Sequence, residues 1–480
     1  MKRKKSAVIR SAVMLTAALT AAGAGAAAGA GARAGAGARA GATGVIAAAV
    51  RATGDRVNAP VSGRAYTDFV RVGNAPADQV PFTDGQCEAT FSIDCYLPTQ
   101  IEAAYNLPAI YNRGITGKGT TIVIVDAYGS PTINDDLTQF DDYIGLGVPP
   151  FQIVRYGNIP PFDSSNGNML GWAEETTLDV EYAHAGAPGA KIVLVEAPSD
   201  SDSALYGAVN YAITHRLGDV ISMSWGDFEP NEGSSGVHSY DKLFAAAEKA
   251  HITVVVSSGD DGASGINNNG NYFTHPVVDY PASNPLVTAV GGTQINIDAS
   301  GTRGGPDSAW NDTYDKSAND FYFGSDGPTP LASGGGKSIY YSRPSYQNGV
   351  KSITGNHRGV PDISMSASCT AAVNVYQTFY GVQGGWYPAC GTSEAAPMFA
   401  AVVALAAQAA GHSLGFINPA LYKLASEHAP GIVAVTSGNN TVSFNNTTVH
   451  GYSVRNGYNL VTGLGTINGQ YLVPELAKLG

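Results

Sequence analysis

Two short segments of this chain carry residue types suited to covalent chemistry on a peptide bond. The first, residues 391–397 (GTSEAAP), places Ser393 after a glycine and before an alanine-rich apolar stretch. Glycine permits a tight turn, and a helix that begins near the serine would aim free backbone N–H groups at an oxyanion. A bare GTS is more typical of an N-cap serine, but this context favours a nucleophile.

The second segment, residues 174–181 (EETTLDVE), offers a base for that serine. Glu175 and Asp179 are four residues apart, a spacing that puts both carboxylates on one helix face. Like charges so close need full solvation or a shared proton. A solvated helix start is the ordinary interpretation. The apolar flank, and nine histidines of which none has a His-Gly-Thr context, favour a carboxylate base instead. Such a base works at a pH well below neutral, with Asp179 orienting Glu175 and relaying its proton.

Asp260 is a candidate for oxyanion stabilisation. It lies in VVVSSGDDGASG, directly after an apolar strand. An aspartate must be protonated to donate a hydrogen bond to an oxyanion, and surroundings that raise its pKa allow this. An ordinary turn aspartate fits the same sequence equally well.

The elements that must position these residues alternate between apolar strands and helices. This alternation predicts an α/β fold with a parallel central sheet flanked by helices on both faces. Active residues of such sheets gather at the carboxyl ends of strands, where Asp126, Ser224, Asp260 and the loop before Ser393 are expected. The predicted strands span residues 121–125, 190–197, 219–226, 252–262 and 286–293, and helices are predicted at 99–114 and from about 393.

The N-terminus predicts export. A basic start, MKRKK, a short apolar stretch and Ala-Gly-rich residues indicate a signal peptide over residues 1–30 and a secreted, extracellular protein. The apolar stretch is too short for a membrane span, so no stable membrane association is expected. Residues 31–94 are interpreted as a low-complexity tract and a short extension, and residues 95–480 as one folded domain.

The net charge and the cysteines limit the possible partners and the possible disulfide pairings. The net charge is −12, and the first 40 residues hold seven lysines and arginines but no acidic residue, so the remainder is still more anionic. This excludes nucleic acid as an expected partner. Four cysteines allow three pairings, and export with local spacing favours Cys87–Cys95 and Cys369–Cys390.

Together these residues resemble the sedolisin family of serine-carboxyl peptidases, which share the subtilisin fold. The resemblance runs from about Cys95 to Gly465. The family's ExxxD pattern matches Glu175 and Asp179, its SSGDSGA segment matches SSGDDGA with Asp260, and its GGTSASxP segment matches CGTSEAAP with Ser393. SGGGKS, RPSYQ, RGVPDIS and TAVGGT are similar to further family segments. The resemblance implies an acid-active, monomeric serine endopeptidase that acts on polypeptides through a Ser393 acyl-enzyme.

Two departures from the family pattern change these expectations. The family carries a long N-terminal activation domain, whereas only residues 31–94 separate the predicted signal peptide from Cys95 here. The family's calcium site corresponds to Val435, Gly457 and Asn459, but Ala434 and Asn459 stand where the acidic ligands would be. Calcium prefers anionic oxygen, so we expect no tight calcium site and no cofactor for the chemistry.

Two alternatives stay open from the sequence. One is a subtilisin-like Ser-His-Asp peptidase that uses Asp126 and a histidine without a recognisable context. The other is an inactive secreted binding protein on the same fold.

Overall fold

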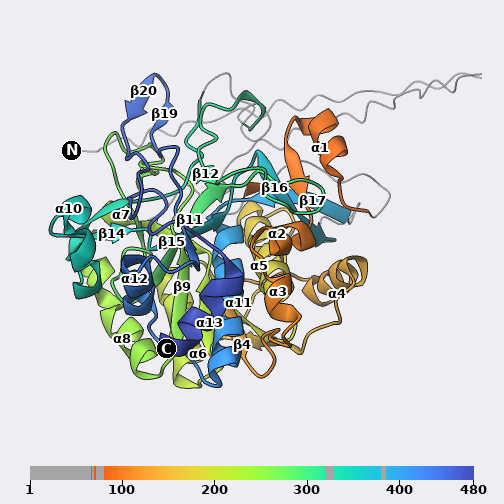
Figure 1. Ribbon diagram of the computed structural model, residues 1–480. Coiled ribbons are helices and arrows are strands. Elements are labelled where there is room, and N and C mark those ends of the chain that lie inside the picture. The colour runs from red at the N-terminus through yellow and green to blue at the C-terminus, as the bar shows by residue number, and fades with distance from the viewer. Residues whose placement is uncertain (1–65, 68–69, 72–79, 319–327, 380–384, 480) are drawn as a thin grey trace, which may run out of the picture. The chain divides into compact units, whose positions relative to one another are not determined.

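The computed structural model describes residues 66–67, 70–71, 80–318, 328–379 and 385–479, and its central sheet follows the order β12-β11-β9-β7-β4-β6-β5 (Figure 1). A further strand, β15, pairs with β11 off this path. All pairings in this sheet are parallel except that of β11 with β12, so the predicted α/β class is confirmed. The strands are β4 (Thr121–Ala127), β5 (Phe151–Arg155), β6 (Lys191–Ala197), β7 (Val220–Met223), β9 (Thr253–Ser257), β11 (Thr288–Gln294), β12 (Ser308–Ala309) and β15 (Ile363–Ser366).

Side chains of the strands alternate between two hydrophobic cores, one on each face of the sheet. In β4, Ile122 and Ile124 enter the first core, whereas Val123 and Val125 enter the second. The first core is covered by α2 (Pro98–Ala104), α3 (Pro108–Tyr111), α4 (Ile133–Ile144), α5 (Gly167–Gly186), α11 (Thr392–Ala410), α12 (Asn418–Ser426) and α13 (Gly469–Leu479). The second is covered by α6 (Asp202–Thr214), α7 (Glu229–Ser239) and α8 (Asp241–Lys249). A sheet buried on both faces explains why its strands are continuously apolar.

Helices α5 and α11 pack against each other at close range. A Cβ atom built on Gly186 would lie only 2.7 Å from the Cβ of Ala401, so only glycine permits this approach. By length and composition α11 resembles a membrane span, with a mean hydropathy of 1.3 over 18 residues. Because 83% of that window is buried inside the protein, α11 is a core helix.

Two smaller sheets lie beside the main one. The first has the order β2-β17-β16-β3 and the second β1-β8-β10. Both include a short strand from the N-terminal extension: β1 pairs antiparallel with Trp225–Gly226, and β2 pairs antiparallel with Ala389–Cys390. The strands are β1 (Tyr66–Thr67), β2 (Val70–Arg71), β3 (Asp94–Tyr96), β8 (Trp225–Phe228), β10 (Asp279–Tyr280), β16 (Ala371–Gln377) and β17 (Gly385–Cys390).

The remaining elements decorate the periphery of the two large cores. They are α1 (Asp84–Phe91), β13 (Gly336–Ser342), a 3-10 helix (Ser345–Val350), α10 (Lys351–Thr354), β14 (His357–Val360), β18 (Ile432–Val433), β19 (Val442–Phe444), β20 (Thr447–Val449) and β21 (Thr466–Ile467). Helix α1 belongs to the segment that the sequence assigned to the extension, and Phe82 and Cys87 anchor it in a small core that also holds Trp310, Cys369 and Cys390. The predicted signal peptide, residues 1–30, lies outside the described residues.

Both predicted disulfides are present. The Cα atoms of Cys87 and Cys95 are 5.9 Å apart, and those of Cys369 and Cys390 are 5.0 Å apart. The single helix predicted over 99–114 is wrong, because the chain forms α2 and α3 separated by Asn106 at φ +57°. Pro108 then starts α3, a position where its missing N–H costs little. The strand predicted over 219–226 is likewise divided, with Ser224 between β7 and β8.

A buried ion pair ties three elements of the fold together. Arg358 in β14 and Asp362 just before β15 are fully buried, and Nη1 of Arg358 lies 2.6 Å from Oδ1 of Asp362. Asp362 also accepts hydrogen bonds from Ala289 N at 2.9 Å and from the Tyr422 hydroxyl at 3.0 Å. The pair therefore links β15 to β11 and α12, beneath the RGVPDIS segment.

We expect Arg358→Met to lower the free energy of unfolding by about 3–5 kcal/mol, because it leaves the Asp362 charge buried without its cation. Urea denaturation near neutral pH measures the change. Arg155→Met is the matched control: Arg155 pairs with Glu196 at 3.1 Å, but its side chain is 67% exposed. That control should lose less than about 1 kcal/mol. Equal losses in the two variants would contradict a special role for the buried pair.

Candidate active site

The candidate nucleophile lies at the start of a long and largely buried helix. Strand β17 ends at Cys390, Gly391 adopts φ +115°, and α11 begins at Thr392. Ser393 is thus the second residue of α11, where backbone N–H groups have no intrahelical acceptor. Its side chain is fully buried, and its hydroxyl forms no hydrogen bond to another described residue. Thr392 N donates to Asp260 and Glu394 N donates to the Gly391 carbonyl, so the N–H that can serve an oxyanion beside this hydroxyl is that of Ser393 itself.

The proline of the GTSEAAP segment lies beyond the first turn of α11. Pro397 is the sixth residue of α11. A helical N–H bonds to the carbonyl four residues earlier, so the missing N–H of Pro397 leaves the carbonyl of Ser393 without that partner. The departure from regular helix bonding therefore lies at the candidate nucleophile itself.

Asp260 holds the turn that precedes Ser393. Its Oδ1 accepts hydrogen bonds from the backbone N–H and the hydroxyl of Thr392, both at 2.8 Å. The Thr392 hydroxyl in turn accepts from Gly259 N at 3.2 Å. Gly259 has φ +101°, and a Cβ there would lie 1.8 Å from the Asp279 carboxyl, so the loop requires glycine. The structure thus brings the predicted Asp260 next to the predicted Ser393, through a threonine whose role the sequence did not indicate.

The candidate base pair lies deep in α5. This helix begins at Gly167, so Glu174 and Glu175 lie in its interior and are not a solvated helix start. Glu175 and Asp179 are both fully buried. Asp179 Oδ1 accepts a hydrogen bond from the Ser224 hydroxyl at 2.7 Å. Ser224 was expected at a strand end, and the structure shows that it contacts the pair from between β7 and β8.

The directions of α5 and α11 place Glu175 and Ser393 at the same end of the sheet. α11 starts beside Asp260, beyond the carboxyl end of β9, and ends where Gln408 Oε1 accepts from Thr116 N at 2.7 Å, ahead of β4. α5 likewise ends shortly before the start of β6. From the contact of Gly186 with Ala401, Glu175 lies about 16 Å back along α5 and Ser393 about 12 Å back along α11.

The histidines lie elsewhere. Of the nine, only His184 is buried, and the other eight are exposed. His184 is nine residues after Glu175 on α5, and its Nε2 lies 3.2 Å from Asp141 Oδ1 and 3.2 Å from Gly147 O. It is a packed residue in the interior of the protein. Asp126, the acid of a subtilisin-like alternative, is fully buried in β4, and burial raises its pKa.

Buried carboxyl groups surround the helices that carry the site. Burial raises the pKa of Glu394, the residue after Ser393, to about 8. It raises the pKa of Glu102 in α2 to about 8 and that of Asp227 in β8 to about 7. The pKa of Glu181 in α5 is also raised well above its ordinary value by burial. These groups are therefore neutral in acid, the state in which a dry interior tolerates them.

The residues that correspond to the family's calcium site do not fit a calcium ion. Asn459 is buried, and its Oδ1 already accepts from Val461 N at 3.0 Å and Thr462 N at 2.9 Å. Its Nδ2 donates to the Thr462 hydroxyl at 3.0 Å. Val435 and Gly457 bring no side-chain oxygen, and calcium prefers anionic ligands. Within the part of the chain described, no group of three or more His, Cys, Asp or Glu residues is placed to hold a metal.

Comparison with known proteins finds a matching family model, related sequences and a similar solved structure. Residues 166–428 match the model of the Subtilase family. Kumamolisin from Bacillus sp. (strain MN-32) is 31% identical over 79% of this chain, and sedolisin from Pseudomonas sp. (strain 101) is 30% identical over 75% of it. The chain spans 63% and 59% of the length of these curated relatives. The solved structure of a Pseudomonas sedolisin, a serine-carboxyl proteinase complexed with two molecules of pseudo-iodotyrostatin, superimposes with a TM-score of 0.66 at 28% identity, covering 80% of this chain and 98% of that one.

The raised pKa of Glu394 predicts a stability that depends on pH. The folded state binds this proton more tightly than the unfolded state, whose pKa is near 4.5. The contribution is therefore fully present below about pH 4.5, and it is lost as pH rises towards about 8. Glu394→Gln should flatten the fall in the free energy of unfolding across this window, by an amount on the order of 4 kcal/mol at most. Urea denaturation at steps between pH 4 and 8 measures it, and an unchanged slope would contradict the assignment.

The hydrogen bonds of the Asn459 side-chain amide predict that its loop does not need calcium. A chelator should leave the midpoint of thermal unfolding unchanged, whereas Asn459→Ala should cost about 1–3 kcal/mol because Val461 N and Thr462 N lose their acceptor. Calorimetric titration of the chelated protein with calcium provides the direct check. Binding in the micromolar range would overturn this prediction.

Proposed function

Because the chain belongs to the sedolisin family, on the subtilase fold, we propose that it is a secreted serine-carboxyl endopeptidase that cleaves polypeptides in acid. The observation that carries this proposal is the buried set at one end of the sheet: a serine at the start of α11, and a Glu-Asp pair on the helix packed against it. The chain covers only part of its relatives, so its activity is inferred from these residues of its own.

In the proposed reaction Glu175 takes the proton of the Ser393 hydroxyl as the oxygen attacks the carbonyl carbon of the scissile peptide. The tetrahedral oxyanion is stabilised by the Ser393 backbone N–H and by protonated Asp260. Because Asp260 Oδ1 accepts two hydrogen bonds from Thr392, the donated proton would sit on Oδ2. Glu175 then gives its proton to the leaving amine, and a water molecule activated by the same carboxylate hydrolyses the acyl-enzyme.

Asp179 is proposed to hold Glu175 in place and to share its proton. Two buried carboxyl groups one helical turn apart cannot both ionise without a large cost, so one proton between them is the stable state. The Ser224 hydroxyl donates to Asp179 Oδ1, so Oδ2 of Asp179 is the oxygen proposed to carry the shared proton before the attack. Glu175 is then the ionised member of the pair and can accept the proton of Ser393.

A polypeptide substrate is supported by two strand edges near the site. Residues Trp225–Gly226 of β8, next to Ser224, pair with an extended segment in the full chain. Ala389–Cys390 of β17, just before the Ser393 turn, pair with another. Edges that bind one extended strand by backbone hydrogen bonds can bind a substrate in the same way.

Acid activity is supported by the state of the interior. Ionising the buried carboxyl groups lowers the stability of the fold, and protonation relieves both this cost and the repulsion of a chain with net charge −12. Export is supported by the cysteines, since all four form disulfides and such bonds persist in oxidising compartments.

The two alternatives receive less support. A Ser-His-Asp peptidase would need an imidazole in the site, but eight histidines are exposed and His184 bonds to Asp141. An inactive binding protein has no need for a buried carboxyl pair beside a buried serine, an arrangement that costs stability.

We expect purified protein to cleave denatured casein at pH 3–4, and Ser393→Ala to lower kcat/KM by at least about 10⁴-fold, because both the acyl-enzyme and the attacking oxygen are lost. Glu175→Gln should lower kcat by at least about 10³-fold, since an amide cannot accept the serine proton. Glu248→Gln, in the exposed face of α8, is the matched control and should retain full activity. Activity in Ser393→Ala equal to wild type, or a rate that peaks at alkaline pH, would refute the proposal.

A further inference from the structure

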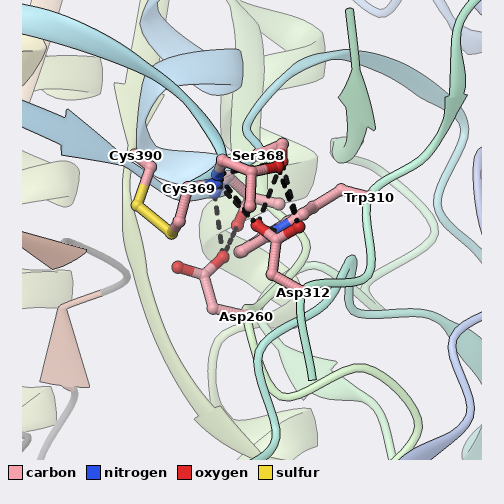
Figure 2. Close-up of a disulfide and its surroundings, with 8 residues drawn as sticks. Asp260, Trp310, Asp312, Ser368, Cys369 and Cys390 are labelled. Atoms are coloured by element: carbon pink, nitrogen blue, oxygen red, sulfur yellow. Dashed lines mark hydrogen bonds between the residues drawn. A yellow bond between two sulfur atoms is a disulfide. The ribbon is translucent and has the colours of Figure 1, made fainter. Parts of the chain in front are cut away.

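A buried aspartate outside the proposed catalytic set organises the loop behind the nucleophile turn. Asp312 is 2% exposed, and its carboxyl accepts hydrogen bonds from four residues. Oδ2 accepts from Trp310 Nε1 at 2.7 Å, Cys369 N at 2.8 Å, the Ser368 hydroxyl at 3.0 Å and Thr370 N at 3.3 Å, and Oδ1 accepts from the Thr370 hydroxyl at 3.3 Å. Figure 2 shows Asp312 between Trp310 and the segment that holds Ser368 and Cys369.

This segment is connected to the nucleophile turn by two bonds. Cys369 forms the disulfide with Cys390, the last residue of β17. Gly391 N, the next residue, donates to Ala367 O at 2.9 Å. The turn is therefore held on one side by the Asp312 loop and on the other by Asp260 through Thr392 (Figure 2).

We propose that Asp312 is a positioning residue for Ser393, acting through residues 368–370 and the Cys369–Cys390 disulfide. The inference rests on the proposed function, in which the hydroxyl of Ser393 attacks the substrate. Asp312 fixes two consecutive backbone N–H groups and two hydroxyls, so residues 368–370 have one stable conformation. The disulfide links these residues covalently to Cys390, three residues before the nucleophile, and so restrains its position.

The hydrogen bonds of Asp312 with Trp310 and residues 368–370, which we call the clamp, persist in both protonation states of Asp312. Burial raises its pKa to about 6, so the carboxyl is neutral in acid. The neutral acid still accepts from Trp310 and Cys369, and its own proton can go to the Ser368 or Thr370 hydroxyl, because hydroxyl groups both donate and accept. An asparagine has the same arrangement of one acceptor and one donor, whereas an alanine has neither.

The size of the effect follows from the precision that the attack requires. A displacement of about 1 Å in a reacting atom can cost about 10²-fold in rate, and loss of a group that orients a catalytic residue costs about 10–100-fold. We therefore expect Asp312→Ala to lower kcat about 10–100-fold at pH 3–4. KM should change less than about threefold, because Asp312 itself belongs to neither of the strand edges proposed to bind substrate. Asp312→Asn should restore kcat to within about fivefold of wild type.

The disulfide provides an independent arm of the experiment. The Cys369→Ser/Cys390→Ser variant should lose kcat to a similar extent, and adding Asp312→Ala to it should cost less than about threefold more, because both changes break the same connection. Cys87→Ser/Cys95→Ser is the matched control, since that disulfide joins α1 to β3. Asp136→Ala is the control for loss of a buried carboxyl: Asp136 accepts from the Thr378 hydroxyl at 2.6 Å, and burial raises its pKa to about 6.

A readout that does not need activity separates this inference from the proposed function. Hydrogen–deuterium exchange at pH 4 should increase at residues 367–370 and 390–394 in Asp312→Ala, and not in Asp136→Ala. If wild type cleaves and Ser393→Ala does not, but Asp312→Ala retains wild-type kcat and exchange, the positioning role is refuted while the proposed function stands. Equal losses of kcat in both aspartate variants would also refute it, because the effect would then be general destabilisation. If wild type does not cleave at all, the proposed function fails, and unchanged exchange in Asp312→Ala would refute the clamp independently.

Discussion

Carboxylic acids lie in the dry interior of this protein, close to the helices that carry Ser393 and Glu175. Glu394 is in the first turn of α11, Glu181 is in α5, and Glu102 is in α2, and for each the dominant effect on the pKa is burial. A buried carboxylate is costly unless it is paired, but a buried carboxylic acid costs no more than another hydrogen-bonding group. Protonation of these three groups therefore stabilises the fold in acid, the same condition that would suit the proposed carboxylate base.

Ion pairs compensate other carboxyl groups of the fold. Arg358 is buried with Asp362 at the junction of β14, β15 and α12, and the partly exposed Arg303 pairs with Asp307 near β12. Glu175 and Asp179 instead share the interior of α5 with apolar residues and with Ser224. A cation close to the pair would lower the pKa of both groups and remove the proton that they need to share. Structural ion pairing and the proposed proton transfer are therefore carried by different carboxyl groups.

The sequence predicted those features that depend on residues close together in the chain. Apolar strands alternating with helices were enough to predict the parallel sheet, and the spacing of Glu175 and Asp179 placed them correctly on one helix face. The roles of Thr392, Ser224 and Asp312 were not predicted, because each depends on a partner at least 45 residues away. The break between α2 and α3 was missed because Asn106 adopts a left-handed conformation that its sequence does not require. The burial of Glu174 and Glu175 was not predicted, because α5 begins seven residues before Glu174 and this start is not marked by charges.

The turn before Ser393 shows how stability and chemistry are separated in this fold. A disulfide that closes a loop of about 20 residues, such as Cys369–Cys390, contributes about 3 kcal/mol by restricting the unfolded chain. Such a contribution could come from a disulfide anywhere in the domain. What is particular here is its position, between an aspartate that fixes residues 368–370 and a glycine at φ +115° that starts the turn. Glycine gives the backbone its freedom at this point, so the geometry of the turn has to be imposed from outside it. Asp260 supplies that restraint on one side of Thr392, and the disulfide supplies it on the other.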